Sequence, residues 1–176
     1  VTSVPDRTRD LIGRWRSRRA TLPGPFDLDG FRARADYGQD ARSALMVISV
    51  ENADAIANDA GPAVAKQLAA DVCAAIGPHL RQTDLAAPIS DDRVGVVMTE
   101  LPPTGDISLI EIADRMLHAI DQIRTSRGPQ PVLRIGIAPA EAGILTHDLL
   151  QRAQQALEHG RINQMRRAVA PIATSV

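Results

Sequence analysis

The positions of the aromatic residues constrain the possible core of this chain more than any other sequence feature. All four aromatic residues lie in the first 37 of 176 residues: Trp15, Phe26, Phe31 and Tyr37. Since 44% of the chain is hydrophobic, the sequence predicts a folded core built from Ala, Val, Ile and Leu. The same placement excludes the aromatic platforms on which single-stranded nucleic acids stack. The length fits one domain.

Four apolar runs predict the strands. The near-continuous run Ala44–Val50 is typical of a central strand that is buried on both faces. Leu85–Ile89 and Val94–Met98 flank the polar tetrapeptide Ser90–Arg93, which indicates a β-hairpin. Leu133–Ala138 is the fourth strand.

Helical patterns fill the intervals between these runs. Helices are expected over about 26–36, 53–76, 106–124 and 146–159. Gly61 and Pro62 interrupt the second of these, as a C-cap followed by a first helical residue. The resulting order, β-α-α-β-β-α-β-α, favours a ferredoxin-like α+β fold with a mainly antiparallel sheet flanked by helices.

Composition divides the chain into three parts. Residues 1–20 carry six arginines against Asp6 and Asp10, so we expect a basic N-terminal helix or linker that packs Trp15 on the body or on a partner copy. A phosphate-binding arm is the alternative for this segment. Residues 21–168 form the predicted domain, and residues 169–176 a flexible tail.

The charge balance and the cysteine count narrow the possible partners. With 20 basic and 21 acidic residues, the net charge of −1 gives no global attraction to nucleic acid or to anionic membranes. Cys73 is the sole cysteine and is expected to be a small buried hydrophobe. We expect a cytoplasmic protein without a membrane span, a signal peptide or a cofactor. Four histidines show no metal-ligand spacing: His79, His118, His147 and His159.

Five local segments, in order, give the chain a family resemblance. From about Leu22 to Arg166 it resembles the diguanylate cyclase (GGDEF) family, which implies the nucleotide-cyclase palm fold. The matching segments are Leu22–Phe31, Val47–Gly61, Ser90–Val94 at the signature hairpin, Arg134–Ala138 against S-I-G-x-A, and Leu149–Leu157 against the L-L-x-x-A-D-x-A-L-Y helix.

The resemblance implies a reaction whose metal ligands this sequence has replaced. Active members join two GTP molecules into cyclic di-GMP, and such phosphoryl transfer uses metal ions held by carboxylates. Ser49 stands at the first metal-binding Asp, and Arg93 at the signature Glu. Only Asp92 and Glu51 retain acids. We therefore expect a pseudo-diguanylate cyclase with no catalytic residue and no metal.

The positions that the resemblance assigns to GTP binding are altered as well. Ser90 and Asp91 replace the two signature glycines. Ala57 and Lys66 replace the residues that read guanine. Asp54 replaces a Lys, whereas Arg161 keeps a cation at the late phosphate-binding Lys. Ser90, Asp91, Asp92, Arg93 and Val94 form the degenerate signature hairpin. Asp91, Asp92 and Arg93 are expected to be an ordinary solvated hairpin tip, with a residual mononucleotide pocket as the alternative.

A regulatory site implied by the same resemblance keeps its residues. Family members bind their product at an Arg-x-x-Asp motif, and here Arg81 and Asp84 stand at the family's offset, with Asp84 six residues before Ser90. Arg115 matches the arginine that completes the site. Guanidinium groups suit phosphate oxygens and guanine O6 and N7, and a carboxylate suits guanine N1 and N2. The alternative is an Arg81–Asp84 surface ion pair.

The sequence thus predicts a catalytically silent receptor for cyclic di-GMP. The ligand sites are Arg81, Asp84 and Arg115, and the signal passes to an unidentified protein partner. A homodimer is expected either through residues 5–20 or bridged by ligand, with no nucleic-acid or membrane partner. Two alternatives stay open: a protein-interaction scaffold independent of nucleotides, and a weakly active diguanylate cyclase.

Overall fold

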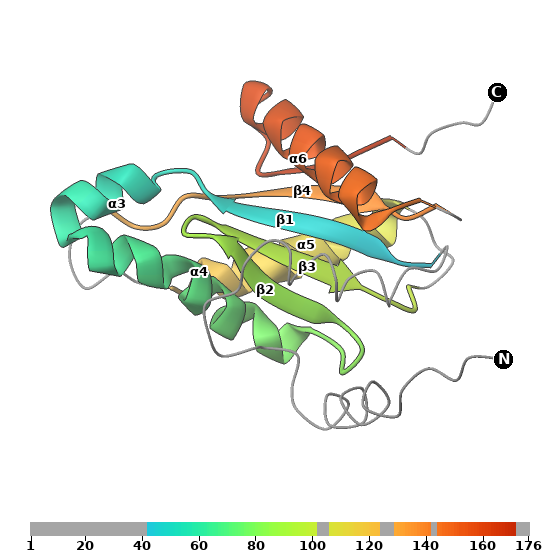
Figure 1. Cartoon of the computed structure of the whole chain (residues 1–176), viewed down its shortest axis with the longest axis horizontal. Helices are drawn as coiled ribbons and strands as arrows, with labels where there is room; N and C mark the ends of the chain where they lie inside the picture. Colours follow the sequence, from blue (N-terminus) through green and yellow to red (C-terminus); the bar gives the residue numbers. More distant parts are fainter. Residues whose placement is uncertain (1–41, 102–105, 124–128, 142–143, 172–176) are drawn as a thin grey trace, which may run out of the picture.

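The computed structural model describes residues 42–101, 106–123, 129–141 and 144–171. Its elements follow one another along the chain as shown in Figure 1. They are β1 (Ala44–Val50), α3 (Ala53–Ala60), α4 (Pro62–Ile76), the short 3₁₀-helix η1 (Gly77–His79), β2 (Leu85–Ser90), β3 (Arg93–Met98), α5 (Asp106–Ile120), β4 (Leu133–Pro139), α6 (Thr146–Ile162) and β5 (Arg167–Val169). The predicted basic helix in residues 1–20 and the predicted helix over 26–36 lie outside the described residues.

A five-stranded sheet forms the centre of the fold, in the order β2-β3-β1-β4-β5. Its first four strands pair antiparallel, and β5 joins β4 in parallel. All seven residues of β1 are buried, as expected for an apolar run in a central strand. The predicted α+β fold with a mainly antiparallel sheet is confirmed.

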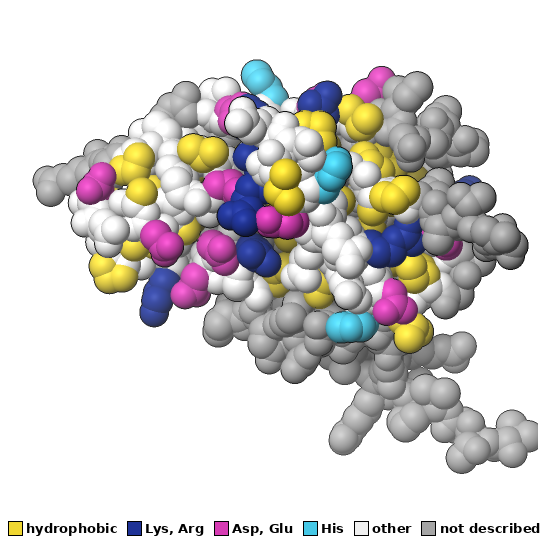
Figure 2. Space-filling model, turned by 90° about the horizontal axis from the view of Figure 1, so that it is seen from above, with side chains coloured by type: hydrophobic (Ala, Val, Ile, Leu, Met, Phe, Trp, Pro, Cys, Tyr) yellow, Lys and Arg dark blue, Asp and Glu magenta, His cyan; other side chains and the backbone are white. Residues whose placement is uncertain are grey.

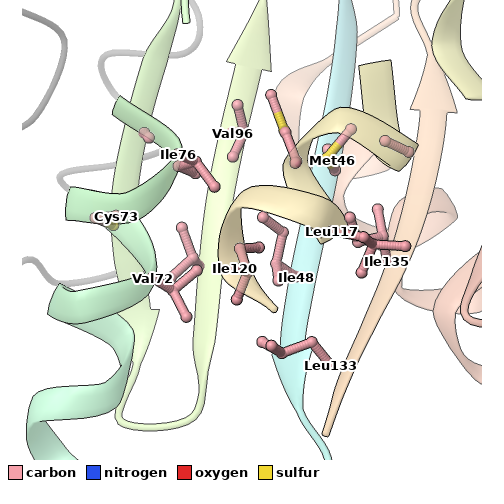
Figure 3. Close-up of a cluster of buried hydrophobic side chains, with 14 of the residues drawn as sticks. Met46, Ile48, Val72, Cys73, Ile76, Val96, Leu117, Ile120, Leu133 and Ile135 are labelled. Atoms are coloured by element: carbon pink, nitrogen blue, oxygen red, sulfur yellow. The ribbon is translucent and has the colours of Figure 1, made fainter. Parts of the chain in front are cut away.

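Helices cover both faces of the sheet, and β1 alternates its side chains between them. Met46 and Ile48 belong to the buried cluster that contains residues of α4 and α5, whereas Leu45 and Val47 belong to the cluster that contains residues of α6. Figure 3 shows the first cluster, in which Val72, Cys73 and Ile76 of α4 and Leu117 and Ile120 of α5 meet the strands. This core is aliphatic with methionine, as expected for a chain that has no aromatic residue after Tyr37.

The break between α3 and α4 follows the predicted glycine–proline signal. Gly61 has φ +99°, a backbone conformation that side-chain-bearing residues rarely adopt, and Pro62 begins α4. The backbone N–H of Gly61 donates to the carbonyl of Ala57 at 3.0 Å. The break turns the chain so that α4 packs under the sheet and α3 stands at its end (Figure 1).

The strand β5 was not predicted from the sequence, and its position changes one predicted boundary. The expected tail at 169–176 starts inside β5, because Val169 pairs with Ile137 and the N–H of Ala170 donates to the Ile137 carbonyl at 2.7 Å. Ala170 is buried. A three-residue strand with a leading arginine carries no periodic signal, so it was not distinguishable from a tail.

Among the described residues, no helix combines the length and apolarity needed to cross a bilayer.

Candidate functional site

A pocket opens where β1 ends, between α3, the start of α4 and the tip of the β2–β3 hairpin. Its volume is about 380 Å³. The lining residues are Val50, Glu51, Ala53, Asp54, Ala57, Pro62, Ala65, Lys66, Asp91 and Asp92. Four of these are acidic and one is basic, so acidic side chains predominate in the lining.

Positions that the sequence analysis took from widely separated segments meet in this pocket. Glu51, Asp54 and Ala57 come from the segment after β1, and Lys66 from α4. Asp91 comes from the hairpin tip. The structure thus brings residues that are far apart in the sequence into one pocket.

Ser49 lies beside the pocket rather than in its lining. It sits on β1 with 4% of its surface exposed. In the sheet register it lies opposite Arg93 on β3 and opposite Arg134 on β4. A neutral hydroxyl thus lies between two arginines at the position where the resemblance implies a metal-binding carboxylate.

Each of the two retained acids has a guanidinium neighbour. Arg134 Nε lies 3.5 Å from Glu51 Oε2, and only 15% and 20% of these two side chains is exposed. Arg93 Nε lies 3.8 Å from Asp92 Oδ2, with both side chains 42% exposed. The negative charges of Glu51 and Asp92 are therefore balanced within the protein itself.

The hairpin tip is closed by its own residues. The Ser90 hydroxyl donates to Asp92 Oδ1 at 2.6 Å. The N–H of Val50 donates to the Asp92 carbonyl at 2.8 Å, which ties the tip to the end of β1. Val94 is buried opposite Ile48. Of the residues expected at a solvated tip, Asp91 is exposed, and Asp92 and Arg93 are half-buried.

The residues at this site do not fit the metal ions that the resemblance implies. Magnesium requires several carboxylate oxygens at fixed geometry, whereas Ser49 is neutral and Arg93 is cationic. Within the described ranges, no group of three His, Cys, Asp or Glu side chains is placed to hold a metal ion. We derive no metal-dependent step for this site.

At the opposite end of the hairpin, Asp84 is buried and accepts two backbone hydrogen bonds. Its Oδ2 accepts the N–H of Arg81 at 2.8 Å, and its Oδ1 accepts the N–H of Thr99 at 3.0 Å. Only 5% of the residue is exposed. Burial raises the pKa of this carboxyl, and the hydrogen bonds from Thr99 and Arg81 oppose that shift.

The carboxylate of Asp84 has a structural role in this turn, because both of its oxygens accept backbone hydrogen bonds. The contact with guanine N1 and N2 that the family resemblance implies stays a prediction. Asp84 closes the turn that begins at Arg81, whose carbonyl in return accepts the N–H of Asp84 at 3.1 Å. The contact between the two residues runs through the Arg81 backbone N–H, whereas the alternative expectation was a side-chain ion pair.

Arg81 presents an exposed guanidinium from this closed turn. Its Nη1 donates to the carbonyl of Glu100 at 2.8 Å. Glu100 follows β3 and has φ 53°, which is uncommon for a residue with a side chain. A guanidinium carries five donors, and among the described residues the other N–H groups of this one have no hydrogen-bond partner.

Arg115 lies on α5 and is exposed. Its neighbour Asp114 pairs with Arg167 of β5, with Oδ1 3.0 Å from Nε. In the part of the chain that the structure describes, no hydrogen bond or ion pair joins Arg115 to Arg81 or Asp84. The structure thus brings Arg81 and Asp84 together, and among the described residues Arg115 does not contact them through a hydrogen bond or an ion pair.

Arg134 and Thr99 are the residues that the sequence analysis did not assign. Arg134 begins the segment Arg134–Ala138, where the family pattern S-I-G-x-A has a Ser, and this exchange is the signal that the sequence offers. Thr99 contributes a backbone N–H, which leaves no signal in the sequence.

The palm-like sheet with a pocket at its hairpin defines a domain of the nucleotide-cyclase type. The family model described as diguanylate cyclase, GGDEF domain, matches residues 28–167. The chain belongs to the GGDEF domain family. Among curated proteins, none matches the sequence.

Solved structures share this fold at low sequence identity. The GGDEF domain of PA1120 (YfiN or TpbB) from Pseudomonas aeruginosa is 22% identical, with TM-score 0.69 over 86% of this chain and 99% of that one. The GGDEF domain of DgcB from Caulobacter crescentus, in complex with c-di-GMP, is 16% identical, with TM-score 0.69 over 88% and 96%. Diguanylate cyclase SiaD from Pseudomonas aeruginosa, in complex with its activator SiaC, is 15% identical, with TM-score 0.72 over 93% and 66%.

Proposed function

We propose that this GGDEF domain binds cyclic di-GMP without synthesising it, and passes the bound state to a protein partner. The single observation that carries the proposal is the closed turn at Arg81–Asp84. That turn fixes an exposed guanidinium at the position where the family resemblance implies a product-binding site.

The residues in and beside the pocket at the end of β1 support the proposal that this domain does not synthesise cyclic di-GMP. Arginine neighbours balance Glu51 and Asp92, and Ser49 offers no charge for a metal ion. Asp91 adds a negative charge at the hairpin tip that lines the pocket. A triphosphate would meet acidic groups without the metal ions that phosphoryl transfer requires.

Asp84 has a positioning role in this proposal. It accepts a hydrogen bond from the backbone N–H of Arg81 and so fixes the backbone that carries the guanidinium. We expect the conformational entropy lost by Arg81 on ligand binding to be small for this reason. Arg81 and the exposed Arg115 then supply donors for phosphate oxygens and for the Hoogsteen edge of guanine. In this account the ligand is gripped by two cations.

Two of the similar structures support the ligand and the partner. The DgcB domain was solved with c-di-GMP, and SiaD with an activator protein. The proposed partner of this chain remains unidentified, and its proposed place of action is the cytoplasm. Dimerisation through residues 5–20 stays a prediction, because that segment lies outside the described residues.

Calorimetric titration with cyclic di-GMP tests the proposal. Arg81→Ala and Arg115→Ala are each expected to weaken binding by about tenfold or more, since each removes a charged donor. Arg161→Ala is the matched control, because Arg161 is an exposed arginine at the former catalytic end. Unchanged affinity in both Arg81→Ala and Arg115→Ala, or a loss only in Arg161→Ala, contradicts the proposed site.

The burial of Asp84 favours a second candidate, a protein-interaction scaffold that binds no nucleotide. An Asp84 engaged by backbone groups serves the stability of the hairpin whether or not a ligand is present. This candidate predicts no heat with cyclic di-GMP for the wild-type chain. A weakly active cyclase instead predicts GTP turnover with magnesium, and an assay for the dinucleotide product separates these outcomes.

A further inference from the structure

Three arginine–carboxylate pairs gather around the end of β1 that faces the pocket and the last turns of α6. They are Arg134–Glu51, Arg93–Asp92 and Arg161–Glu158. The hydrogen bonds from Arg161 lower the pKa of Glu158, and the charge of Arg93 adds to this effect. Figure 2 shows side chains of both signs side by side on the face that carries α6. The cluster is neutral, with three charges of each sign.

Arg134 is the most firmly fixed member of this cluster. Its Nη1 donates to the carbonyl of Gly160 at 2.9 Å and also to the carbonyl of Met165. Its Nε is buried without a hydrogen-bond partner in the described part of the chain, 3.5 Å from Glu51 Oε2. The guanidinium is thus held by the end of α6 and by the segment before β5, and it faces Glu51.

The register of the sheet places this fixed charge next to the altered metal position. Arg134 lies directly opposite Ser49, and Arg93 lies opposite Ser49 on the other side. A carboxylate at position 49 would therefore stand between two guanidinium groups. Because a guanidinium keeps its charge at every working pH, both arginines stay cationic beside position 49.

We propose that Arg134 excludes divalent cations from the pocket by supplying beside Glu51 the positive charge that a metal ion would otherwise supply. The inference rests on the catalytic silence in the proposed function and explains what maintains it. Restoring the two carboxylates is not sufficient to rebuild a metal site, because the fixed charge of Arg134 repels the incoming ion. Arg134, rather than Ser49 or Arg93 alone, decides whether the pocket binds a divalent cation.

Binding of Mn²⁺, followed by the electron paramagnetic resonance signal of the free ion, tests this role. The starting background is Ser49→Asp with Arg93→Glu, which restores both carboxylates. Adding Arg134→Gln is expected to tighten Mn²⁺ binding by about tenfold or more, since the charge is removed while a donor for the Gly160 carbonyl is kept. Arg134→Ser on the same background is the second variant, should the glutamine variant fail to fold by thermal melting.

Arg152→Gln on the same background is the matched control. Arg152 pairs with Glu141 at 2.7 Å, and its side chain is 18% exposed, close to the value for Arg134. The control is expected to leave Mn²⁺ affinity unchanged. Equal Mn²⁺ affinity with and without Arg134, including no binding by either, overturns the proposal, as does an equal gain from Arg152→Gln. The readout uses neither GTP nor cyclic di-GMP, so a failed binding site at Arg81 does not affect it.

Discussion

Asp84 and Thr99 join the two ends of the β2–β3 hairpin opposite its tip. Asp84 Oδ1 accepts the backbone N–H of Thr99 at 3.0 Å, so a buried carboxylate precedes β2 and holds the residue that follows β3. The same carboxylate holds Arg81 through Oδ2. The hairpin that carries the pocket at its tip is thus fixed at its base by one side chain.

Removing this carboxylate is expected to destabilise the domain. In Asp84→Ala the backbone N–H groups of Arg81 and Thr99 lose their acceptor in a part-buried place. We expect the free energy of unfolding to fall by about 2 kcal/mol, as measured by urea denaturation. Asp59→Ala, at an exposed position of α3, is the control and is expected to change stability by less than about 0.5 kcal/mol. A loss no larger than in the control contradicts the role of Asp84.

The raised pKa of Asp84 sets the sign of a pH effect. Because burial places the folded-state pKa above the ordinary 3.8, the folded chain binds the proton more tightly than the unfolded chain. The contribution of Asp84 to stability is therefore complete below pH 3.8 and declines as the pH rises through the folded-state pKa. The difference in unfolding free energy between wild type and Asp84→Asn should fall over this window. A difference that rises with pH contradicts the assignment.

Gly136 tests the contact between β4 and α6. A Cβ at this position would lie closer than 3.0 Å to the backbone of Ala153 and Leu157, because α6 crosses β4 there. Gly136→Ala is expected to cost about 3 kcal/mol or more, or to prevent folding. Gly61→Ala is a comparison with a different cause, since its Cβ meets nothing within 4 Å and only φ +99° is strained. We expect a cost of about 1 kcal/mol there, measured by thermal unfolding. A tolerated Gly136→Ala would contradict the described packing of α6.

Cys73 should resist thiol reagents in the folded chain. It is 3% exposed in the core beneath the sheet, and burial raises its pKa to about 12. Since the thiolate is the reactive form, we expect labelling by a disulfide reagent to proceed only at the rate of opening of the fold. Ala74→Cys in a Cys73→Ala background provides an exposed thiol on the same helix as the control. Equally rapid labelling of both would contradict the burial of Cys73.

Most of the fold was predictable because its elements carry strong local signals. The seven-residue apolar run became β1, and Gly61 with Pro62 divided α3 from α4 as expected. The strand β5 was not predictable, because Arg167–Val169 is short and gains its order from pairing with β4. Non-local pairing of this kind leaves no periodicity in the sequence.

The candidate site was predictable in its membership but less so in its contacts. The family resemblance gathered Glu51, Lys66 and Asp91, which the structure brings into one pocket. The family resemblance did not indicate that Asp84 accepts backbone hydrogen bonds. The N–H of Thr99 lies next to this carboxylate because of the pairing of β2 with β3, which the sequence does not show. The contact of Arg134 with Glu51 was not predictable either, since it depends on β4 lying beside β1.

A titration of isotope-labelled protein with cyclic di-GMP, followed by amide NMR, tests the central claim most directly. The account predicts shift changes that centre on the turn from Arg81 to Asp84 and on α5 around Arg115, and that leave the amides of Glu51 and Lys66 unperturbed. Changes confined to the pocket lined by Glu51 and Lys66, or no changes at saturating ligand, would contradict it.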